Sequence, residues 1–279
     1  MLHLGEIQEL TIVKEVDFGV YLASSMETAQ EKVLLPAKYL PKDKRVGDTL
    51  TVFLYKDSKD RLIATTKEPV MTLHHVGVCE VEQTGKIGAF LNWGLEKDLL
   101  LPFKEQTYPV KQGDQVLVAL YIDKSERLCA TMKVYPYLSK DSQYKKDDKV
   151  QGTVYELSEN FGAFVAVDEK YSALIPKKDL HEKLMVGQRI QARVVSVKAD
   201  GKLDLSLKQK AYLQIEADAS KIREALQANG GVLDFTDKAS PEVIRDRMQM
   251  SKNEFKRAVG HLYKAREIDI KNDNIVLIK

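Results

Sequence analysis

Aromatic side chains flank a glycine in the segment FGAF, residues 161–164, and the chemistry that such a group offers is stacking on nucleobases. In a regular strand Phe161 and Phe164 would point to opposite faces, because successive side chains alternate. Gly162 can bend or bulge the chain so that both rings face the same way. Two exposed rings would then each hold a base with about 1–3 kcal/mol. The alternative is that one or both rings pack inside a core.

Basic side chains that could neutralise phosphates come later in the same stretch. Lys198 and Lys202 lie on either side of the sequence ADG, and we expect them near the face that carries the two rings. Contacts between lysine and phosphate make binding weaken as the salt concentration rises. The residues therefore offer a basic and aromatic surface of the kind that holds single-stranded RNA.

The same pattern occurs three times in the first 209 residues. DFGVYL (17–22), KIGAFL (86–91) and NFGAFV (160–165) are similar, and each continues with an apolar pair and a proline, a glycine turn, and a hairpin loop that ends on a basic residue. The prolines are Pro36, Pro102 and Pro176, and the basic residues are Arg61, Arg127 and Lys202. The period is too long for a solenoid repeat, so we interpret the copies as tandem domains.

Each copy has the pattern of short β-strands. TLTVFLY, QVLVALYI and RIQARVVSV alternate with period two and are rich in β-branched residues. No copy contains a long helical stretch. About five short strands in one copy predict a small closed barrel, and each proline should end a strand because it cannot donate to a ladder.

After residue 209 the pattern becomes helical. Apolar spacing predicts a helix over 216–231 that ends at two glycines. Ser240 caps a second helix over 240–250, and Ser251 opens a third over 251–268 with a capping box. Two short strands around a turn at 272–274 follow.

Three helices and a hairpin are typical of a winged helix. The third helix should expose basic residues that could contact a nucleic-acid backbone, namely Lys252, Lys256, Arg257 and Lys264. An ordinary solvated helix face is the alternative interpretation of the same residues.

Longer stretches of the chain resemble a known family. GTVYELSENFGAFVAV, ALIP, VGQRIQARVVSV and GKLDLSLK resemble the S1 domain, an RNA-binding module with the OB fold. Three such copies followed by a winged helix resemble the conserved virulence factor B family of Gram-positive bacteria, and residues 236–264 are similar to its C-terminal domain. The resemblance covers nearly the whole chain. It implies a mainly β fold, with three tandem S1-like OB-fold barrels and an α+β winged helix-turn-helix domain, and a role in the expression of virulence genes.

The resemblance also assigns an RNA face to each copy, because two aromatics, a histidine, an aspartate and an arginine line that face in S1 domains. In the first copy Phe18, Tyr21 and Arg61 match, with Asp57 as the aspartate. In the second copy Phe90, Asp123 and Arg127 match, and Ile87 replaces the other aromatic. In the third copy Phe161 and Phe164 match, and Lys198 and Lys202 replace the charged pair. A proline stands at the histidine position in all three copies.

Charge and composition narrow the class of protein. The chain has 279 residues, of which 44% are hydrophobic and 30% charged, as expected for several globular domains. Residues 145–209 hold 12 basic and 10 acidic residues, the only positive balance among the copies, so we expect RNA there first. Asp57 with Arg61 and Asp123 with Arg127 should form weak surface ion pairs.

Cysteine content and the N-terminal sequence indicate where the protein acts. Cys79 and Cys129 match no zinc or disulfide spacing and indicate buried thiols in a reducing compartment. The first residues lack the pattern of a signal peptide, and no apolar stretch is long enough to span a membrane. We expect a cytoplasmic protein that needs no metal or cofactor and does not bind membranes.

We therefore expect four domains, at residues 1–68, 69–139, 145–209 and 215–279, with a polar link over 140–149 on which the barrels pivot. The expected function is non-catalytic binding of single-stranded RNA by a monomer that regulates gene expression after transcription, with DNA as a further ligand for the winged helix. Two alternatives stay open. One is a protein-interaction scaffold, since fold does not fix function. The other is an S1-containing nuclease, for which the sequence shows no catalytic motif.

Overall fold

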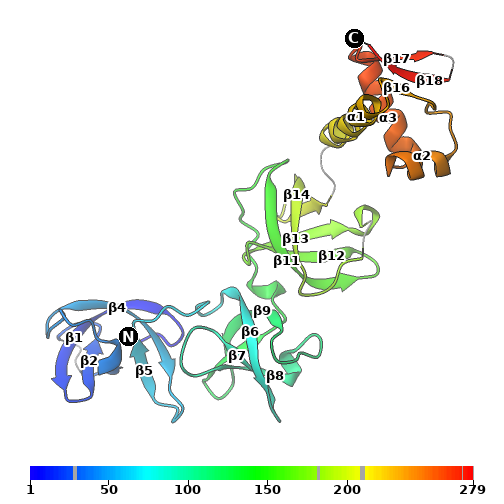
Figure 1. Ribbon diagram of the computed structural model, residues 1–279. Helices are drawn as coiled ribbons and strands as arrows, with labels where there is room; N and C mark the ends of the chain where they lie inside the picture. The colour runs from blue at the N-terminus through cyan, green and yellow to red at the C-terminus, as the bar shows by residue number, and fades with distance from the viewer. Residues whose placement is uncertain (28–29, 181–182, 208–210, 272, 279) are drawn as a thin grey trace. The chain divides into compact units, whose positions relative to one another are not determined.

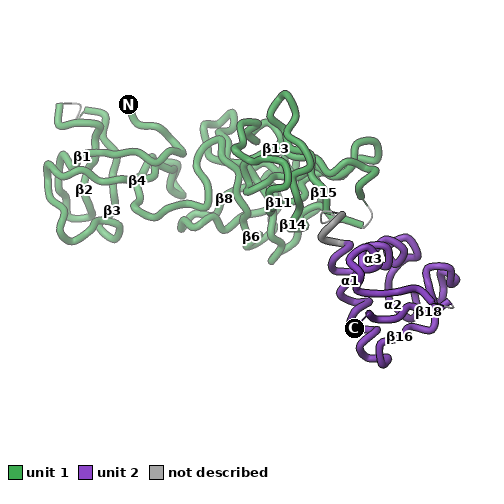
Figure 2. The backbone as a smooth tube through the Cα atoms, turned by 90° about the horizontal axis from the view of Figure 1, so that it is seen from above, with its two compact units in different colours: residues 1–207 green, residues 208–279 purple. Residues whose placement is uncertain are grey.

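Figure 1 shows the computed structural model of the chain, which describes residues 1–27, 30–180, 183–207, 211–271 and 273–278. Contacts divide the chain into two compact units, 1–207 and 208–279 (Figure 2). The first unit is built of strands, and the second combines helices with short strands, so the mainly β architecture is confirmed. Residues 208–209, at the end of the expected third domain, and Asn272, in the expected last turn, lie outside the described residues.

Two five-stranded barrels in the first unit are closed by hydrogen bonds. In each, the first strand pairs antiparallel with the second and the fourth, and the third pairs in parallel with the fifth. This is the small closed barrel that the repeat predicted, with the OB topology that the resemblance to S1 domains implied. Barrel 1 consists of β1 (Ile7–Val16), β2 (Gly19–Ala23), β3 (Val33–Pro36), β4 (Thr49–Lys56) and β5 (Leu62–Thr65). Barrel 3 consists of β11 (Lys149–Ser158), β12 (Gly162–Val167), β13 (Tyr171–Pro176), β14 (Arg189–Val197) and β15 (Leu203–Ser206).

Barrel 2 repeats these strands but is closed less completely. It consists of β6 (Val76–Thr84), β7 (Gly88–Asn92), β8 (Leu99–Pro102), β9 (Gln115–Ile122) and β10 (Leu128–Thr131). The sheet order is β10-β9-β6-β7-β8. Although β8 and β10 lie side by side, no ladder joins them within this fully described stretch.

Period-two alternation places the core inside each barrel. In β12, Ala163 and Val165 are fully buried, whereas Phe164 between them is only half-buried. The three prolines of the repeat, Pro36, Pro102 and Pro176, are the last residues of β3, β8 and β13, as predicted.

The repeated glycine has a steric cause. Gly19, Gly88 and Gly162 begin β2, β7 and β12 with φ values of +149°, +152° and +120°. A Cβ atom on them would lie 2.1, 2.2 and 2.1 Å from the carbonyl oxygens of Leu35, Leu101 and Ile175, respectively. Only glycine fits such a close approach at positive φ, so each copy needs it at this position.

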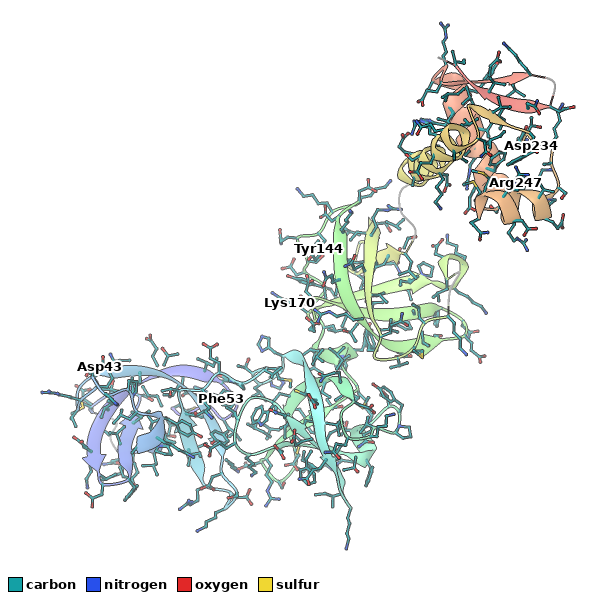
Figure 3. All side chains as sticks on the ribbon, viewed as in Figure 1. Asp43, Phe53, Tyr144, Lys170, Asp234 and Arg247 are labelled. Carbon is teal, nitrogen blue, oxygen red and sulfur yellow. The ribbon has the colours of Figure 1, made fainter. Side chains whose placement is uncertain are left out.

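Apolar side chains join neighbouring barrels within the first unit. Phe53 of β4, labelled in Figure 3, is fully buried, and its ring centroid lies 5.7 Å from that of Trp93 in barrel 2. On the other side of barrel 2, Leu117 and Ala119 of β9 share a buried cluster with Tyr155 of barrel 3. Strands β4 and β9 are therefore buried on both faces.

The polar segment before barrel 3 differs from the expected pivot. Tyr144 donates a hydrogen bond to Asp168 at 2.5 Å, and its ring meets that of Tyr171 edge-on at 6.1 Å. Ser139 forms a β-bridge to Tyr171. The segment is held along barrel 3 because its tyrosine and backbone find partners there, which the polar composition alone did not reveal.

The second unit has the helices and hairpin of a winged helix. Its helices are α1 (Ala211–Ala228), α2 (Pro241–Met248) and α3 (Lys252–Lys264), and its strands are β16 (Val232–Leu233), β17 (Ile268–Lys271) and β18 (Asn274–Leu277), in the sheet order β16-β18-β17. The predicted caps are confirmed, because Ser240 accepts from the backbone N–H of Val243 and Ser251 forms a capping box with Glu254. Arg247, in the last turn of α2, pairs with Asp234 at 2.9 Å (Figure 3).

The first helix corrects its predicted bounds. The expected range was 216–231, but α1 begins at Ala211 and ends at Ala228. Apolar spacing marks only the part that packs in the core, where Ala219, Ile222 and Leu226 are fully buried, so it misses the first turns. At the other end Gly230 and Gly231 have positive φ values of +67° and +92° and lie beyond the helix.

Candidate nucleic-acid interface

Phe161 and Phe164 lie next to each other on the outside of barrel 3. Phe161, in the turn before β12, is 63% exposed. Its ring centroid lies 6.4 Å from that of Phe164, with an angle of 59° between the rings. Phe164 belongs to the outward row of the ladder, where it pairs with Glu156 of β11 and Leu174 of β13. Neither ring is in the barrel core.

The backbone feature that brings the rings together is not a bulge at Gly162. The register shift lies in β11, between Val154 and Glu156, so the extra residue is Tyr155, whose ring centroid lies 6.1 Å from that of Phe164. At Gly162 the positive φ turns the chain, and the carbonyl oxygen of Phe161 accepts a hydrogen bond from the N–H of Lys177 at 2.9 Å. The glycine therefore bends the chain, and the bulge is in the neighbouring strand.

Two lysines that the sequence pattern did not predict lie beside this aromatic pair. Lys177 and Lys178 are exposed in the short 3₁₀ helix Lys177–Asp179 that follows β13. Neither forms an ion pair within the described ranges. The feature of the sequence that could have indicated these lysines is their position directly after Pro176, which ends the strand that pairs with β12. Glu156, on the other side of Phe164, is exposed and acidic, so the basic side of the platform is that of Lys177 and Lys178.

Lys198 and Lys202, predicted at this site, both have carboxylate partners. Lys198 lies 3.1 Å from Asp204, which is next to Leu174 in the ladder and thus in the same outward row as Phe164. Lys202 pairs with Asp200 at 3.0 Å, and its Nζ lies 5.7 Å from the ring centroid of Tyr135. The hydrogen bond with Asp200, followed by that with Tyr135, raises the pKa of Lys202, so it stays charged.

Barrel 1 has the corresponding aromatic residues, and the basic residue of its motif is paired with an aspartate. Phe18 is 58% exposed, and Tyr21 is half-buried, with the Nζ of Lys32 5.0 Å from its ring centroid. Arg61 pairs with Asp57 as expected, and its Nε and Nη2 both donate to the Oδ2 of Asp57, at 2.9 and 2.7 Å. Although partial burial opposes ionisation of Asp57, this pair and two backbone N–H groups hold the pKa of its carboxyl below the usual value.

Barrel 2 departs from the predicted ion pair. Arg127 was expected to pair with Asp123, but its guanidinium pairs with Asp60 of barrel 1. Asp123 accepts from the backbone N–H groups of Arg127 and Ser125 instead, at 3.0 and 2.8 Å, because it caps its own hairpin loop. Phe90 is half-buried, and Ile87, in the place of the missing aromatic, is 60% exposed.

The four basic residues of α3 are not equivalent. Lys252 donates to the carbonyl oxygen of Ala239 at 3.0 Å and is half-buried. Lys256, Arg257 and Lys264 are exposed on the side opposite the buried residues, without an ion pair among the residues described. Three of the four predicted residues are thus exposed to solvent.

The described residues give little support for a metal site or for a reactive cysteine. No group of three or more His, Cys, Asp or Glu residues there could hold a metal ion. Cys79 and Cys129 are free and buried, and burial raises the pKa of their thiols to about 12 and about 11, respectively. Within the described ranges, no helix has the length and apolarity that crossing a membrane requires.

Family comparisons cover most of the chain. The family described as S1 domain matches residues 4–67 and 77–133. The family described as virulence regulatory factor CvfB, second domain, matches residues 136–209, and the CvfB-like winged helix domain matches residues 220–277.

Individual relatives match over nearly their full length. The Bacillus subtilis protein YitL is 32% identical over 270 residues, which are 93% of this chain and 89% of that protein. Conserved virulence factor B of Staphylococcus haemolyticus is 28% identical over 99% of this chain and 95% of its own. A crystal structure of a multidomain protein with nucleic acid binding domains from Streptococcus pneumoniae is 27% identical, with a TM-score of 0.51 over 99% of this chain and 98% of that one. On these matches and on the shared order of barrels and winged helix, the chain belongs to the conserved virulence factor B family.

Proposed function

We propose that this chain is a non-catalytic protein that binds single-stranded RNA and thereby regulates gene expression after transcription. The observation that carries the proposal is the pair of rings outside barrel 3, Phe161 and Phe164, with Lys177 and Lys178 at the same end of the barrel. Rings stack on bases of any sequence, and lysines neutralise the phosphates between them. The S1 matches support this interpretation, as does the similarity to a pneumococcal protein with nucleic acid binding domains.

The other modules would add affinity through linkage. Phe18 and Tyr21 of barrel 1 offer a second aromatic pair, and the exposed Lys256, Arg257 and Lys264 of α3 offer phosphate contacts. Connecting weak sites in one chain raises the effective concentration at the second site. Lys198, Lys202, Arg61 and Arg127 would contribute less, because each already has a carboxylate partner.

A binding titration tests the proposal. We expect Phe161→Ala with Phe164→Ala to weaken binding of labelled single-stranded RNA at least about tenfold, because each stacked ring contributes about 1–3 kcal/mol. Phe161→Tyr, which keeps a ring, is the matched control and should bind like the natural chain. Unchanged affinity in a folded double variant would contradict the stacking model.

A protein-interaction scaffold is the second candidate, favoured by the ion pairs that neutralise Arg61 and Arg127. Two results together would favour the scaffold. A protein partner would stay bound to the chain after nuclease treatment, and the variant with both Phe161→Ala and Phe164→Ala would keep its RNA affinity. Cleavage of labelled RNA in the presence of magnesium would favour the nuclease alternative.

A further inference from the structure

The turn that joins barrel 2 to barrel 3 carries an exposed aromatic ring. This turn is the short 3₁₀ helix Tyr135–Tyr137, which follows β10 in the chain. Tyr135 is 45% exposed, whereas Val134 before it and Leu138 after the turn are buried. Two apolar side chains therefore anchor the turn and leave one ring outside.

The anchors of this turn lie on barrel 3. Val134 and Leu138 share a buried cluster with Ala166 of β12. The backbone N–H of Ser139 donates to the carbonyl oxygen of Lys170 at 2.8 Å. Apolar packing and backbone hydrogen bonding thus fix the turn on barrel 3, so the position of the exposed ring is set by the fold.

The β14–β15 hairpin of barrel 3 closes on the same segment. A Cβ atom on Gly201, in the loop of this hairpin, would lie 1.9 Å from the carbonyl oxygen of Lys140. The Nζ of Lys202, the next residue of the hairpin, lies 5.7 Å from the ring centroid of Tyr135. Tyr135 therefore lies at the edge of barrel 3, although it belongs to the connection from barrel 2.

The ladder places this edge beside the aromatic pair of barrel 3. Asp204 lies next to Leu174, and Leu174 lies next to Phe164, so the three residues form one outward row. Lys202 is the next outward position along the chain of β15, about 7 Å from Asp204. A ligand that leaves Phe164 crosses two strand spacings, about 10 Å, and then meets Tyr135 beside Lys202.

Tyr155 fills the space beneath this face. It is buried, and its ring centroid lies 6.1 Å from that of Phe164. Burial raises the pKa of Tyr155, and the nearby Glu156 and Tyr135 add to the increase, which agrees with a position of Tyr135 close to its hydroxyl. Tyr155 therefore links Phe164 and Tyr135 from below and leaves the surface above them open to a ligand.

The chemistry of the edge fits a base better than a phosphate. Lys202 already has a carboxylate partner, Asp200, at 3.0 Å, so a phosphate gains little from it. The exposed ring of Tyr135 offers a flat apolar surface, on which a base stacks with about 1–3 kcal/mol. Tyr135 lies between the residue ranges 77–133 and 136–209 that match the two families of barrels, so neither match assigns it a role.

We propose that Tyr135 stacks on a base of the same RNA strand that lies on Phe161 and Phe164. The binding surface is then shared between barrel 3 and the turn that joins it to barrel 2. The inference rests on the proposed RNA binding. Because the turn is fixed on the barrel, the third ring has a set spacing from the first two, and only a strand long enough to span that spacing uses all three.

The length of the RNA tests this spacing. The full chain is titrated with labelled oligouridylates of about three and about ten nucleotides, since OB folds hold about 4–16 nucleotides. Tyr135→Ala should weaken binding of the long strand at least about fivefold, because one stacked base is lost. It should leave the short strand nearly unaffected, because that strand occupies the two rings Phe161 and Phe164. Phe161→Ala should weaken binding of both strands.

Further variants separate stacking from packing and from charge. Tyr135→Leu keeps apolar bulk without a ring and should lose as much affinity as Tyr135→Ala, whereas Tyr135→Phe should retain most of it. Lys202→Gln should lose less than Tyr135→Ala, since the ring does not act through the lysine alone. Phe103→Ala removes an exposed ring of barrel 2 and should leave the affinity unchanged. Near-ultraviolet circular dichroism checks the fold of each variant.

The outcomes separate this proposal from the proposed function. Unchanged binding of the long strand by Tyr135→Ala, with a loss in the variant that lacks both phenylalanines, overturns the third ring and leaves RNA binding by barrel 3 intact. Full affinity in Tyr135→Leu, or an equal loss for both lengths of RNA, also overturns it. A natural chain that binds no RNA of either length overturns the proposed function, and this inference with it.

Discussion

Arg127 of barrel 2 pairs with Asp60 of barrel 1 and not with Asp123, which lies four residues before it in the sequence. Its side chain is 55% exposed and that of Asp60 is 42% exposed, so the pair is accessible to solvent and to ions. A phosphate that approaches Arg127 must compete with this carboxylate. The same contact that joins two barrels therefore weakens one of the predicted RNA contacts.

Removing the competing carboxylate should strengthen RNA binding. For Asp60→Asn we expect a gain of about 1.4–5-fold in affinity, because an exposed ion pair is worth about 0.2–1 kcal/mol. The gain should shrink as salt screens the charges. Anisotropy titrations at low and high salt measure it. Asp43→Asn, an equal charge change at an exposed position of barrel 1, is the control, and an equal gain there would show a general charge effect only.

Lys177 and Lys178 should set much of the salt dependence of binding. Each phosphate contact on a single strand contributes about 0.7 to the slope of log affinity against log salt. We expect Lys177→Gln with Lys178→Gln to reduce that slope by about 0.7–1.4. Lys198→Gln should reduce it less, because Lys198 is paired with Asp204. The reverse order would place the phosphate path on the β14–β15 side instead.

Gly162→Ala should destabilise barrel 3 strongly. Its Cβ would lie 2.1 Å from the carbonyl oxygen of Ile175, at a φ of +120°. Backbone strain and overpacking together predict a loss of at least about 2 kcal/mol in the free energy of unfolding. Gly47→Ala is matched, because Gly47 also has positive φ, at +98°, but nothing within 4 Å of the added Cβ atom. It should cost less, about 1–2 kcal/mol for the backbone conformation alone. Denaturant titration measures the loss in the free energy of unfolding for each variant, and hydrogen exchange locates the affected barrel. Equal losses in the two variants would count against the steric explanation.

The capping box of α3 should make the winged helix sensitive to acid. The backbone N–H of Ser251, and then its side chain, lower the pKa of Glu254. A lowered pKa gives stability that is present above the ordinary glutamate value, about 4.3, and that is lost as the pH falls through the lowered value. Ser251→Ala should cost about 1 kcal/mol at neutral pH, and the difference should narrow in acid.

Glu254→Gln separates charge from hydrogen bonding in this box. Glutamine can still reach the backbone N–H of Ser251, so most of the helix stability should remain at neutral pH. The part of the pH dependence that Glu254 contributes below the ordinary glutamate value, about 4.3, should disappear, because that titrating group is gone. The contributions of Glu216, Glu242 and Glu267, whose pKa values are also lowered, should remain. Hydrogen exchange of the α3 amides over this pH range measures both variants, and an unchanged pH profile would mean that another carboxyl is responsible.

Local rules predicted most of the fold from the sequence. Period-two alternation located the strands, Pro36, Pro102 and Pro176 ended three of them, and the Ser251 box began α3 at the right residue. Each of these features depends only on residues a few positions apart, so it can be predicted from the sequence. The start of α1 was missed because the turns before Ala219 do not share its apolar spacing.

Contacts between copies could not be predicted in the same way. Alternation gives the outward row that contains Phe90 and Leu100, but it does not say that the hairpin of barrel 1 lies over that row. For the same reason Arg127 was matched with the nearest aspartate in sequence. Lys177 and Lys178 were missed because the motif has no basic position directly after the proline that ends the third strand of each copy.

The missing ladder between β8 and β10 gives barrel 2 a mechanical property that the closed barrels lack. A cavity of about 300 Å³ lies at this seam, lined by Leu99 and Leu100 of β8 on one side and by Leu128 and Cys129 of β10 on the other. In barrels 1 and 3 the corresponding strands are tied by parallel pairing. Because no described strand pairing crosses this seam, β8 and β10 can move apart there without breaking a ladder of the sheet, whereas the same movement in barrels 1 and 3 would break backbone hydrogen bonds.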